Sequence, residues 1–401
     1  MSSEKTKLVP KLRFPEFRGA EGWGTEKVDT LVETVTPPQK LPTSMYAASG
    51  TFPIIDQSQS YICGWTDDKE SLIQQGLPLI VFGDHTCILK LIDRPFAQGA
   101  DGIKILKARP TVLATYLYQF LGYRPVITEE YKRHFSTLKE KAVFFPNVKT
   151  GEQQKIADCL SSVDELIAAQ ARKVDALKTH KKGLMQQLFP IEGETQPRLR
   201  FPEFRGAGEW ECLTLADVAQ ISSGTTPSRS NSEFFNGGII PWVKTTDLNN
   251  ALISQTEECI TPKARARVNP VGSVLVAMYG GFNQIGRTGC LRVPAATNQA
   301  LSVLVLDKNR ALPVYVLAWL NAKIDVWKRI ASSSRKDPNI TGADVAKFPI
   351  TLPKPDEQQR IAICLTSLDQ LITAATQELD ALKTHKKGLM QQLFPSVAMT
   401  S

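Results

Sequence analysis

Histidines and cysteines are the first side chains to test for catalytic or metal chemistry. His85 follows Asp84 in the run Gly83-Asp84-His85-Thr86, which could supply part of a triad or one metal ligand. No second candidate histidine lies near it in the sequence, so a structural turn or a surface contact is the simpler interpretation. The seven cysteines form no Cys-x-x-Cys pair, which argues against a zinc finger and a disulfide framework. We expect no catalytic residue and no metal ligand in this chain.

Phosphate-binding loops are the next class of site to test. The chain has no Gly-x-Gly-x-x-Gly after a strand and no Walker A sequence. It also lacks the Asn/Asp-Pro-Pro-aromatic tetrapeptide with which adenine methyltransferases grip a flipped base. Gly280-Gly281 could approach a phosphate, but paired glycines in a hairpin more often satisfy turn geometry. The sequence therefore predicts no nucleotide cofactor bound by this chain.

Polar loops supply the side-chain types that bond base edges and phosphates, although solvated loops use the same types. The net charge of +8 and the pI of 9.0 are compatible with a polyanionic partner. The candidate DNA-contacting residues are His85, Thr86, Thr225, Thr226, Arg229, Lys244, Thr245, Asn283, Gln284, Arg287, Arg335 and Lys336.

The elements that must position these residues occur twice in the chain. Residues 175–190 read DALKTHKKGLMQQLFP, and residues 380–395 repeat all 16 letters. Upstream, LRFPEFRGA occurs at residues 12–20 and again at 199–207. The first pair is shifted by 205 residues and the second by 187, so the second variable region is 18 residues longer. The chain is an internal duplication of an anchor, a variable body and a long helix.

Each copy ends in a segment whose apolar residues alternate at spacings of four and three, which is typical of a coiled-coil seam. The predicted seam residues are Ile156, Leu160, Val163, Ile167, Leu177, Leu184 and Leu188 in the first copy, and Ile361, Leu365, Leu368, Ile372, Leu382, Leu389 and Leu393 in the second. A helix from Glu152 to Leu188 would measure roughly 55 Å. Two such seams most simply pack on each other, antiparallel if the halves are related by a pseudo-twofold axis.

The variable bodies combine strand and helix patterns. Residues 77–91 and 273–293 each read as strand, turn and strand, and residues 110–121 and 313–330 read as mixed helical stretches. We therefore predict an α+β fold with two globular domains separated by two long antiparallel coiled-coil helices. The expected boundaries are 1–150 for the first domain, 151–190 for the first helix, 191–355 for the second domain, 356–395 for the second helix and 396–401 for a tail. No segment has the apolar length of a membrane span and no secretory signal is present, so we expect a cytoplasmic protein.

These motifs resemble the specificity subunits of type I restriction-modification systems over essentially the whole chain. The resemblance is carried by LRFPEFRG in each half, the Glu-Gln-Gln-[Lys/Arg]-Ile-Ala segments, and the helix ends HKKGLMQQLFP. The openings SGTTPS at 223–228 and IPW at 240–242, and the run FGDHT with PFAQGADGIKIL, also match the family. In the second half, the four residues Pro-x-x-x at 353–356 precede the Glu-Gln pair. The first half departs slightly from this spacing, because six residues, 146–151, precede its Glu-Gln pair.

The resemblance implies two target-recognition domains, each reading half of an asymmetric double-stranded DNA site, with the helices setting the spacer. It implies two methylation subunits and further restriction subunits as partners. S-adenosylmethionine, ATP and Mg²⁺ would belong to those partners and not to this chain.

Three alternatives remain open. A methyltransferase or nuclease would need a cofactor loop that the sequence does not contain. A coiled-coil scaffold gives no reason for divergent bodies beside near-identical helices. A silent specificity cassette is compatible with the perfect repeat.

Overall fold

A computed structural model describes residues 8–100, 102–128, 132–281, 283–332 and 339–396. The chain divides into two compact units. The first unit joins residues 1–172 to residues 377–401, so it contains both ends of the chain, and the second unit comprises residues 173–376. The predicted domain boundaries divide the chain into consecutive segments and keep each long helix whole. The compact units instead divide each long helix between them, so the predicted boundaries stay a prediction.

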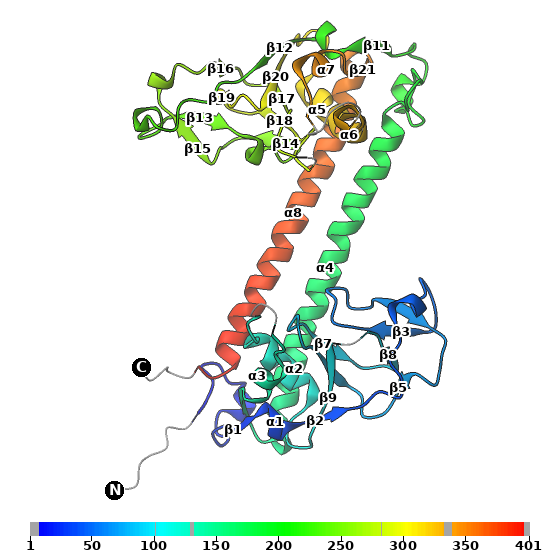
Figure 1. The fold of residues 1–401 in the computed structure, drawn as a ribbon, viewed down its shortest axis with the longest axis vertical. Helices are drawn as coiled ribbons and strands as arrows, with labels where there is room; N and C mark the ends of the chain where they lie inside the picture. Colours follow the sequence, from blue (N-terminus) through cyan, green and yellow to red (C-terminus); the bar gives the residue numbers. More distant parts are fainter. Residues whose placement is uncertain (1–7, 101, 129–131, 282, 333–338, 397–401) are drawn as a thin grey trace. The chain divides into compact units, whose positions relative to one another are not determined.

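The first unit contains a small β-pair and two four-stranded sheets (Figure 1). One sheet has the order β2-β9-β6-β7 and the other β4-β3-β8-β5. In the second sheet, β3 and β8 are parallel and the remaining pairs are antiparallel. The strands are β1 (Gly24–Lys27), β2 (Val32–Val35), β3 (Phe52–Ile55), β4 (Gly64–Thr66), β5 (Leu72–Ile73), β6 (Leu79–Gly83), β7 (Leu89–Ile92), β8 (Phe96–Gln98), β9 (Ile103–Ala108) and β10 (Ala142–Phe145), and the helices are α1 (Val28–Leu31), α2 (Ala114–Tyr123), α3 (Phe135–Lys139) and α4 (Glu152–Leu188).

The second unit repeats this topology. Its sheets have the orders β12-β20-β17-β18-β14 and β15-β13-β19-β16, and β13 and β19 are again the parallel pair. The strands are β11 (Glu211–Thr214), β12 (Ala219–Ser223), β13 (Ile240–Val243), β14 (Ala251–Ile253), β15 (Glu258–Ile260), β16 (Val268–Asn269), β17 (Val274–Ala277), β18 (Thr288–Leu291), β19 (Ala295–Thr297), β20 (Leu301–Leu306) and β21 (Pro349–Leu352), and the helices are α5 (Pro313–Ala322), α6 (Ile324–Ser332), α7 (Gly342–Ala346) and α8 (Pro355–Leu393).

Two elements of the second unit have no counterpart among the described residues of the first. Strand β14 extends the first sheet by pairing in parallel with β18, and α6 follows α5 directly. The sequence predicted one mixed helical stretch over 313–330, whereas the structure divides it at Lys323, whose backbone leaves the helical region. These additions help to account for the greater length of the second body.

Each domain contains one of the two predicted hairpins, and that hairpin begins with a buried strand. All five residues of β6 and all four of β17 are buried, as continuous apolar runs require when both sheet faces are covered. Each strand pairs antiparallel with the next one, β7 or β18, so the strand-turn-strand predictions for 77–91 and 273–293 are confirmed.

The long helices are antiparallel within each unit, which confirms the predicted fold class. In the first unit Lys386 Nζ lies 2.7 Å from Asp164 Oδ1, and Gln170 Nε2 donates to Glu378 Oε2 at 2.8 Å. In the second unit Lys181 Nζ pairs with Asp369 Oδ1 at 2.5 Å. Pairs that lie nearer to the C-terminus of α4 therefore lie nearer to the N-terminus of α8. None of the predicted seam residues is exposed.

A buried ion pair explains why LRFPEFRGA and the Glu-Gln pair recur together. Arg13 Nε and Nη2 both donate to the Glu152 carboxylate at 2.7 Å, and Arg200 makes the same two bonds to Glu357 at 2.7 Å. The glutamate side chains are 1 % and 2 % exposed. Two further N–H groups of Arg13 donate to the backbone carbonyls of Ala20, the last anchor residue, and of Glu21, which follows it. Each anchor is thereby folded around its arginine and attached to the start of a helix.

The glutamine that follows each of these glutamates makes three hydrogen bonds to two further segments. Gln153 Oε1 accepts from Leu113 N at 2.8 Å, while its Nε2 donates to Thr111 O at 3.1 Å and Pro146 O at 2.7 Å. Gln358 repeats the pattern with Leu312 N, Arg310 O and Pro353 O. One buried amide therefore fixes the start of a long helix against the α2 or α5 entry and the end of the β-pair.

The ends of the repeated helices complete the two hydrophobic cores. Phe394 is fully buried in the first unit, with its ring 5.3 Å from Phe120 and 5.7 Å from Tyr116. Phe189 occupies the corresponding place in the second unit, 5.7 Å from Tyr315. The end of α8 is therefore part of the core of the N-terminal domain.

We predict that Arg200→Met lowers the free energy of unfolding of the second unit by about 3–5 kcal/mol, because it leaves the buried Glu357 carboxylate unpaired. The double variant Arg200→Met, Glu357→Leu should recover most of that loss, since both charges are then removed. Arg360→Met is the matched control, because the Arg360–Glu203 pair is exposed to solvent and should contribute little to stability. Urea unfolding followed by hydrogen exchange in each unit measures these values, and equal losses for Arg200→Met and Arg360→Met would contradict the assignment.

Candidate nucleic-acid interface

Polar loops of the second unit meet where parallel strands β13 and β19 end. Asn298 N donates to Val243 O at 2.9 Å, and Thr225 N donates to Thr297 O at 2.8 Å. Thr226 Oγ1 accepts from Gln299 N at 3.5 Å. The structure therefore brings two predicted loops, at Thr225–Thr226 and Lys244–Thr245, together with the loop at Asn298–Gln299, up to 74 residues away in sequence. Thr225 and Thr226 are exposed, and Thr245 is half-buried.

Arg229 and Lys244 share a carboxylate. Glu258 accepts two bonds from Arg229, at 2.7 and 3.2 Å, and one from Lys244 Nζ at 2.7 Å. Lys244 Nζ also donates to Glu257 at 2.8 Å. Hydrogen bonds from Arg229 and Lys244 lower the pKa of Glu258 to about 2. Hydrogen bonds to Glu257 and Glu258 raise the pKa of Lys244.

The Arg229 guanidinium also lies over two aromatic rings. Its guanidinium lies 4.6 Å from the centroid of Phe235 and 5.2 Å from that of Trp242. Both predicted cations are thus neutralised and fixed, so a phosphate would have to compete with Glu258 for them. Glu258 and Glu257 were not identified from the sequence, because acidic residues do not match the expected chemistry of a DNA surface.

The β17–β18 hairpin carries the third predicted group. Asn283 is exposed, and Arg287 Nε donates to its carbonyl at 3.2 Å. Gln284 is half-buried, and its buried Oε1 has no hydrogen-bond partner among the described residues. Gly280 and Gly281 have φ values of 116° and 81°, a conformation that favours glycine. Turn geometry is sufficient to explain this glycine pair.

In the first unit the candidates His85 and Thr86 are exposed on the β6–β7 turn. Thr86 Oγ1 donates to Gln57 O at 2.9 Å. The buried Asp84 carboxylate accepts from the backbone N of His134 and Phe135, at 3.0 and 2.9 Å. Asp84 is thus engaged in loop structure. Among the described residues, no three His, Cys, Asp or Glu side chains are grouped to hold a metal ion.

Tyr279 lies at the position in the second unit that corresponds to His85. Asp84, which precedes His85, bonds Gly102 O through its N and His134 N through its O, and Met278, which precedes Tyr279, makes the same bonds with Ala300 and Ile340. Tyr279 is 45 % exposed, so each hairpin presents a ring at this place. Tyr279 was not predicted from the sequence because the two turns differ in length, although its place two residues after the buried strand β17 was a usable signal.

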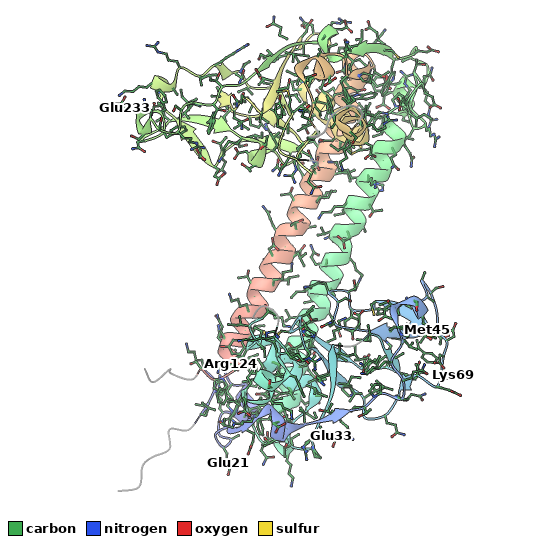
Figure 2. The ribbon with its side chains drawn as sticks, viewed as in Figure 1. Glu21, Glu33, Met45, Lys69, Arg124 and Glu233 are labelled. Atoms are coloured by element: carbon green, nitrogen blue, oxygen red, sulfur yellow. The ribbon has the colours of Figure 1, made fainter. Side chains whose placement is uncertain are left out.

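Lys90 is a second residue whose role was not predicted from the sequence. It is buried, and its Nζ donates to Asp56 O at 2.8 Å and to Ser60 O at 2.6 Å. These bonds fix the loop after β3, which corresponds to the Lys244 loop after β13. Figure 2 shows Met45 and Lys69 in the same part of the first unit, and Glu233 among the outer loops of the second. Arg335 and Lys336 lie outside the described residues.

Comparisons with known proteins give the family. Residues 207–384 match the family model for the type I restriction modification DNA specificity domain. The EcoR124I/EcoR124II specificity subunit of Escherichia coli is 24 % identical over 351 residues, covering 83 % of each chain. Residues 207–384 therefore belong to the type I restriction modification DNA specificity domain family, and the chain as a whole is similar to specificity subunits of type I restriction-modification systems.

Further relatives and solved structures agree with this membership. The MjaIX specificity subunit of Methanocaldococcus jannaschii is 28 % identical over 194 residues, covering 46 % of this chain and 44 % of that one. A crystal structure of a type I S subunit from M. genitalium superposes with a TM-score of 0.66 at 16 % identity, covering 98 % of this chain and all of that chain. This likeness shows a shared fold. The family model and the relatives support a type I specificity subunit with DNA-recognition domains. None of the described helices combines the length and hydropathy that a membrane-spanning segment needs.

We predict that Glu258→Gln strengthens binding of the second unit to non-specific duplex DNA and steepens its salt dependence by about one phosphate contact, because Arg229 and Lys244 lose their shared counter-charge. Affinity measured by fluorescence anisotropy across a salt series tests this. Glu233→Gln is the control, since it removes the same charge from an exposed pair with Lys263. Equal salt slopes for the wild-type protein and Glu258→Gln would show that the two cations do not face DNA.

Proposed function

We propose that this specificity subunit reads an asymmetric, bipartite site in double-stranded DNA, one half with each globular domain. The observation that carries the proposal is one strand topology present twice with unlike loops. The shared sheets give two equivalent platforms, and the divergent loops give each platform different donors and acceptors. Different loops over the same scaffold are what reading two unlike half-sites requires.

The loops at the ends of β12, β13 and β19, together with the β17–β18 hairpin, are the proposed reading surface of the second domain. Thr225, Thr226 and Asn283 are exposed there, and hydroxyl and amide groups bond base edges. In the first domain the corresponding surface includes His85 and Thr86. Cations would contribute sequence-independent affinity through phosphates, while the neutral groups would contribute the choice of bases.

The long helices are proposed to fix the spacing between the half-sites. Helix α4 has 37 residues and α8 has 39, which corresponds to about 55–60 Å of helix. Continuous helices of this length are suited to act as a ruler, because their length changes only by insertion or deletion.

The helices also offer a duplicated surface for a partner. Leu166 and Leu371 are repeat mates that lie off the seam, and they are 57 % and 55 % exposed. Each follows a repeat-mate cysteine at the i−7 position, Cys159 or Cys364, on the same helix face. We propose that two copies of the methylation subunit bind these two surfaces, with restriction subunits joining the assembly. S-adenosylmethionine, ATP and Mg²⁺ would be held by those partners, this chain would be non-catalytic, and the complex would act in the cytoplasm.

Exchanging residues 21–145 for the corresponding body of another specificity subunit should change one half of the methylated motif. The other half and the gap should stay the same, because the second body and both helices are retained. Mapping methylated adenines in cells that express each chimaera with its methylation subunit gives the result. The reciprocal exchange of the second body is the control, and a changed gap would contradict the ruler role of the helices.

Leu166→Asp should remove one of the two methylation subunits, and Leu371→Asp should remove the other, because a carboxylate cannot be buried in an apolar interface without a large cost. Each variant should leave a complex of one specificity and one methylation subunit, measured by native mass spectrometry. Asp at the exposed positions Ala169 and Ala374 tests the extent of the same face. Two bound methylation subunits in the Leu166→Asp, Leu371→Asp double variant would exclude this surface.

A further inference from the structure

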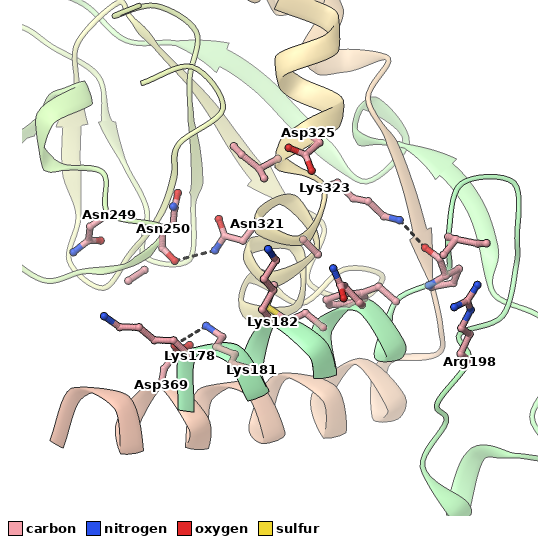
Figure 3. A pocket seen from close by; sticks show the side chains of 18 residues that line it. Lys178, Lys181, Lys182, Arg198, Asn249, Asn250, Asn321, Lys323, Asp325 and Asp369 are labelled. Atoms are coloured by element: carbon pink, nitrogen blue, oxygen red, sulfur yellow. Dashed lines mark hydrogen bonds and ion pairs between the residues drawn. The ribbon is translucent and has the colours of Figure 1, made fainter. Parts of the chain in front are cut away.

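A cavity of about 720 Å³ opens in the second unit beside the C-terminal end of α4. A helix end, a linker, a loop and a helix junction line it (Figure 3). The repeated helix end contributes Lys178, Lys181 and Lys182, and the following linker contributes Arg198. The loop at Asn249–Ala251 and the α5–α6 junction contribute the opposite wall. Its volume lies within the range of ligand pockets, roughly 300–1,000 Å³.

The lining carries an excess of positive charge. Two of its five cations are already engaged, since Lys181 pairs with Asp369 at 2.5 Å and Lys323 Nζ donates to Pro190 O at 2.6 Å. In the part of the chain that the structure describes, Lys178, Lys182 and Arg198 form no ion pair. Asp325 is the remaining carboxylate of the lining. An occupant with negative charge would therefore offset an existing imbalance.

The pocket also presents apolar surface and a fixed amide. Met185, Phe189 and Ile324 supply apolar side chains, and Phe189 is anchored in the core. Asn321 is held by two bonds, because its Nδ2 donates to Asn250 O at 2.8 Å and its Oδ1 accepts from Thr288 Oγ1 at 2.5 Å. The wall opposite the lysines is thus rigid and polar, while the floor is apolar.

We propose that this pocket binds an acidic peptide segment of a partner protein, with an apolar side chain on the floor and flanking carboxylates on Lys178, Lys182 and Arg198. The Lys181–Asp369 pair shows that a lysine of this helix end binds a carboxylate in the same cavity. A DNA backbone fits less well, because it offers no aliphatic or aromatic side chain for the floor and a duplex is too wide to enter a cavity of this size.

Among the described elements this lining is assembled only in the second unit, although the helix end that contributes its lysines occurs twice in the sequence. Lys178 and Lys182 have identical mates, Lys383 and Lys387, in the first unit. The opposite wall comes from the approach to β14 and from α6, which have no counterpart among the described elements of the first unit. The pocket therefore makes the two units unequal, which goes beyond the two equivalent partner surfaces proposed above and does not depend on them.

A random-peptide display selection against the full-length chain tests the proposal. Enriched peptides should combine Asp or Glu with a large apolar residue, and a fluorescein-labelled peptide should bind with one site per chain. The Lys178→Gln, Lys182→Gln variant should weaken that binding about tenfold or more, because two charge-assisted hydrogen bonds are lost. The mated variant Lys383→Gln, Lys387→Gln should change it less than about twofold.

Four results would overturn the proposal. They are a selection that enriches no peptide, enriched peptides without acidic residues, equal losses in the two lysine variants, and displacement of the peptide by duplex DNA with the same lysine dependence. The last result would assign the pocket to the DNA-binding surface. None of these outcomes bears on whether the chain directs methylation to a bipartite site, so failure here is distinguishable from failure of the proposed function.

Discussion

The buried bidentate ion pair between an anchor arginine and the first glutamate of a long helix is the constraint on which each half of the molecule depends. A carboxylate that is almost completely shielded from water is stable only with a partner of this quality, so Arg13 and Glu152 must be retained or lost together. The neighbouring glutamine uses all of its amide atoms to hold the entry of α2 or α5 and the end of the β-pair. Together these bonds explain why the anchor and the Glu-Gln segment repeat while the chain between them diverges.

The same arrangement separates the parts of the chain that hold the fold from the parts that can vary. Anchor, helix start and helix end form one polar and aromatic junction in each unit, and Phe394 and Phe189 insert into that junction from the repeated helix ends. The loops that follow β12, β13 and β19 make none of these contacts. They can therefore change sequence without loss of the junction, which is the property that the proposed reading of two different half-sites needs.

Much of the fold could be predicted from the sequence because its signals are local or duplicated. The seam spacing gave the extent of α4, and continuous apolar runs gave the central hairpins. The Arg13–Glu152 pair could not be predicted, because its members are 139 residues apart and nothing local indicates which carboxylate an arginine will meet. The entry of Phe394 into the first domain was hidden for the same reason.

The candidate interface was predictable in its location but not in its electrostatics. Residue types pointed to Arg229 and Lys244, whereas their pairing with Glu258 depends on how β13 and β15 align in the sheet. Tyr279 was missed because unequal turn lengths concealed its correspondence with His85. Contacts of these residues with DNA stay a prediction.

The most direct test of the account is the methylome of a methylation-free host that expresses this chain with its neighbouring methylation subunit. Single-molecule sequencing of the genomic DNA would show which adenines become modified. The account predicts one new motif, made of two unlike halves separated by a fixed gap. A soluble complex that produces no new motif, or a motif with two identical halves, would contradict it.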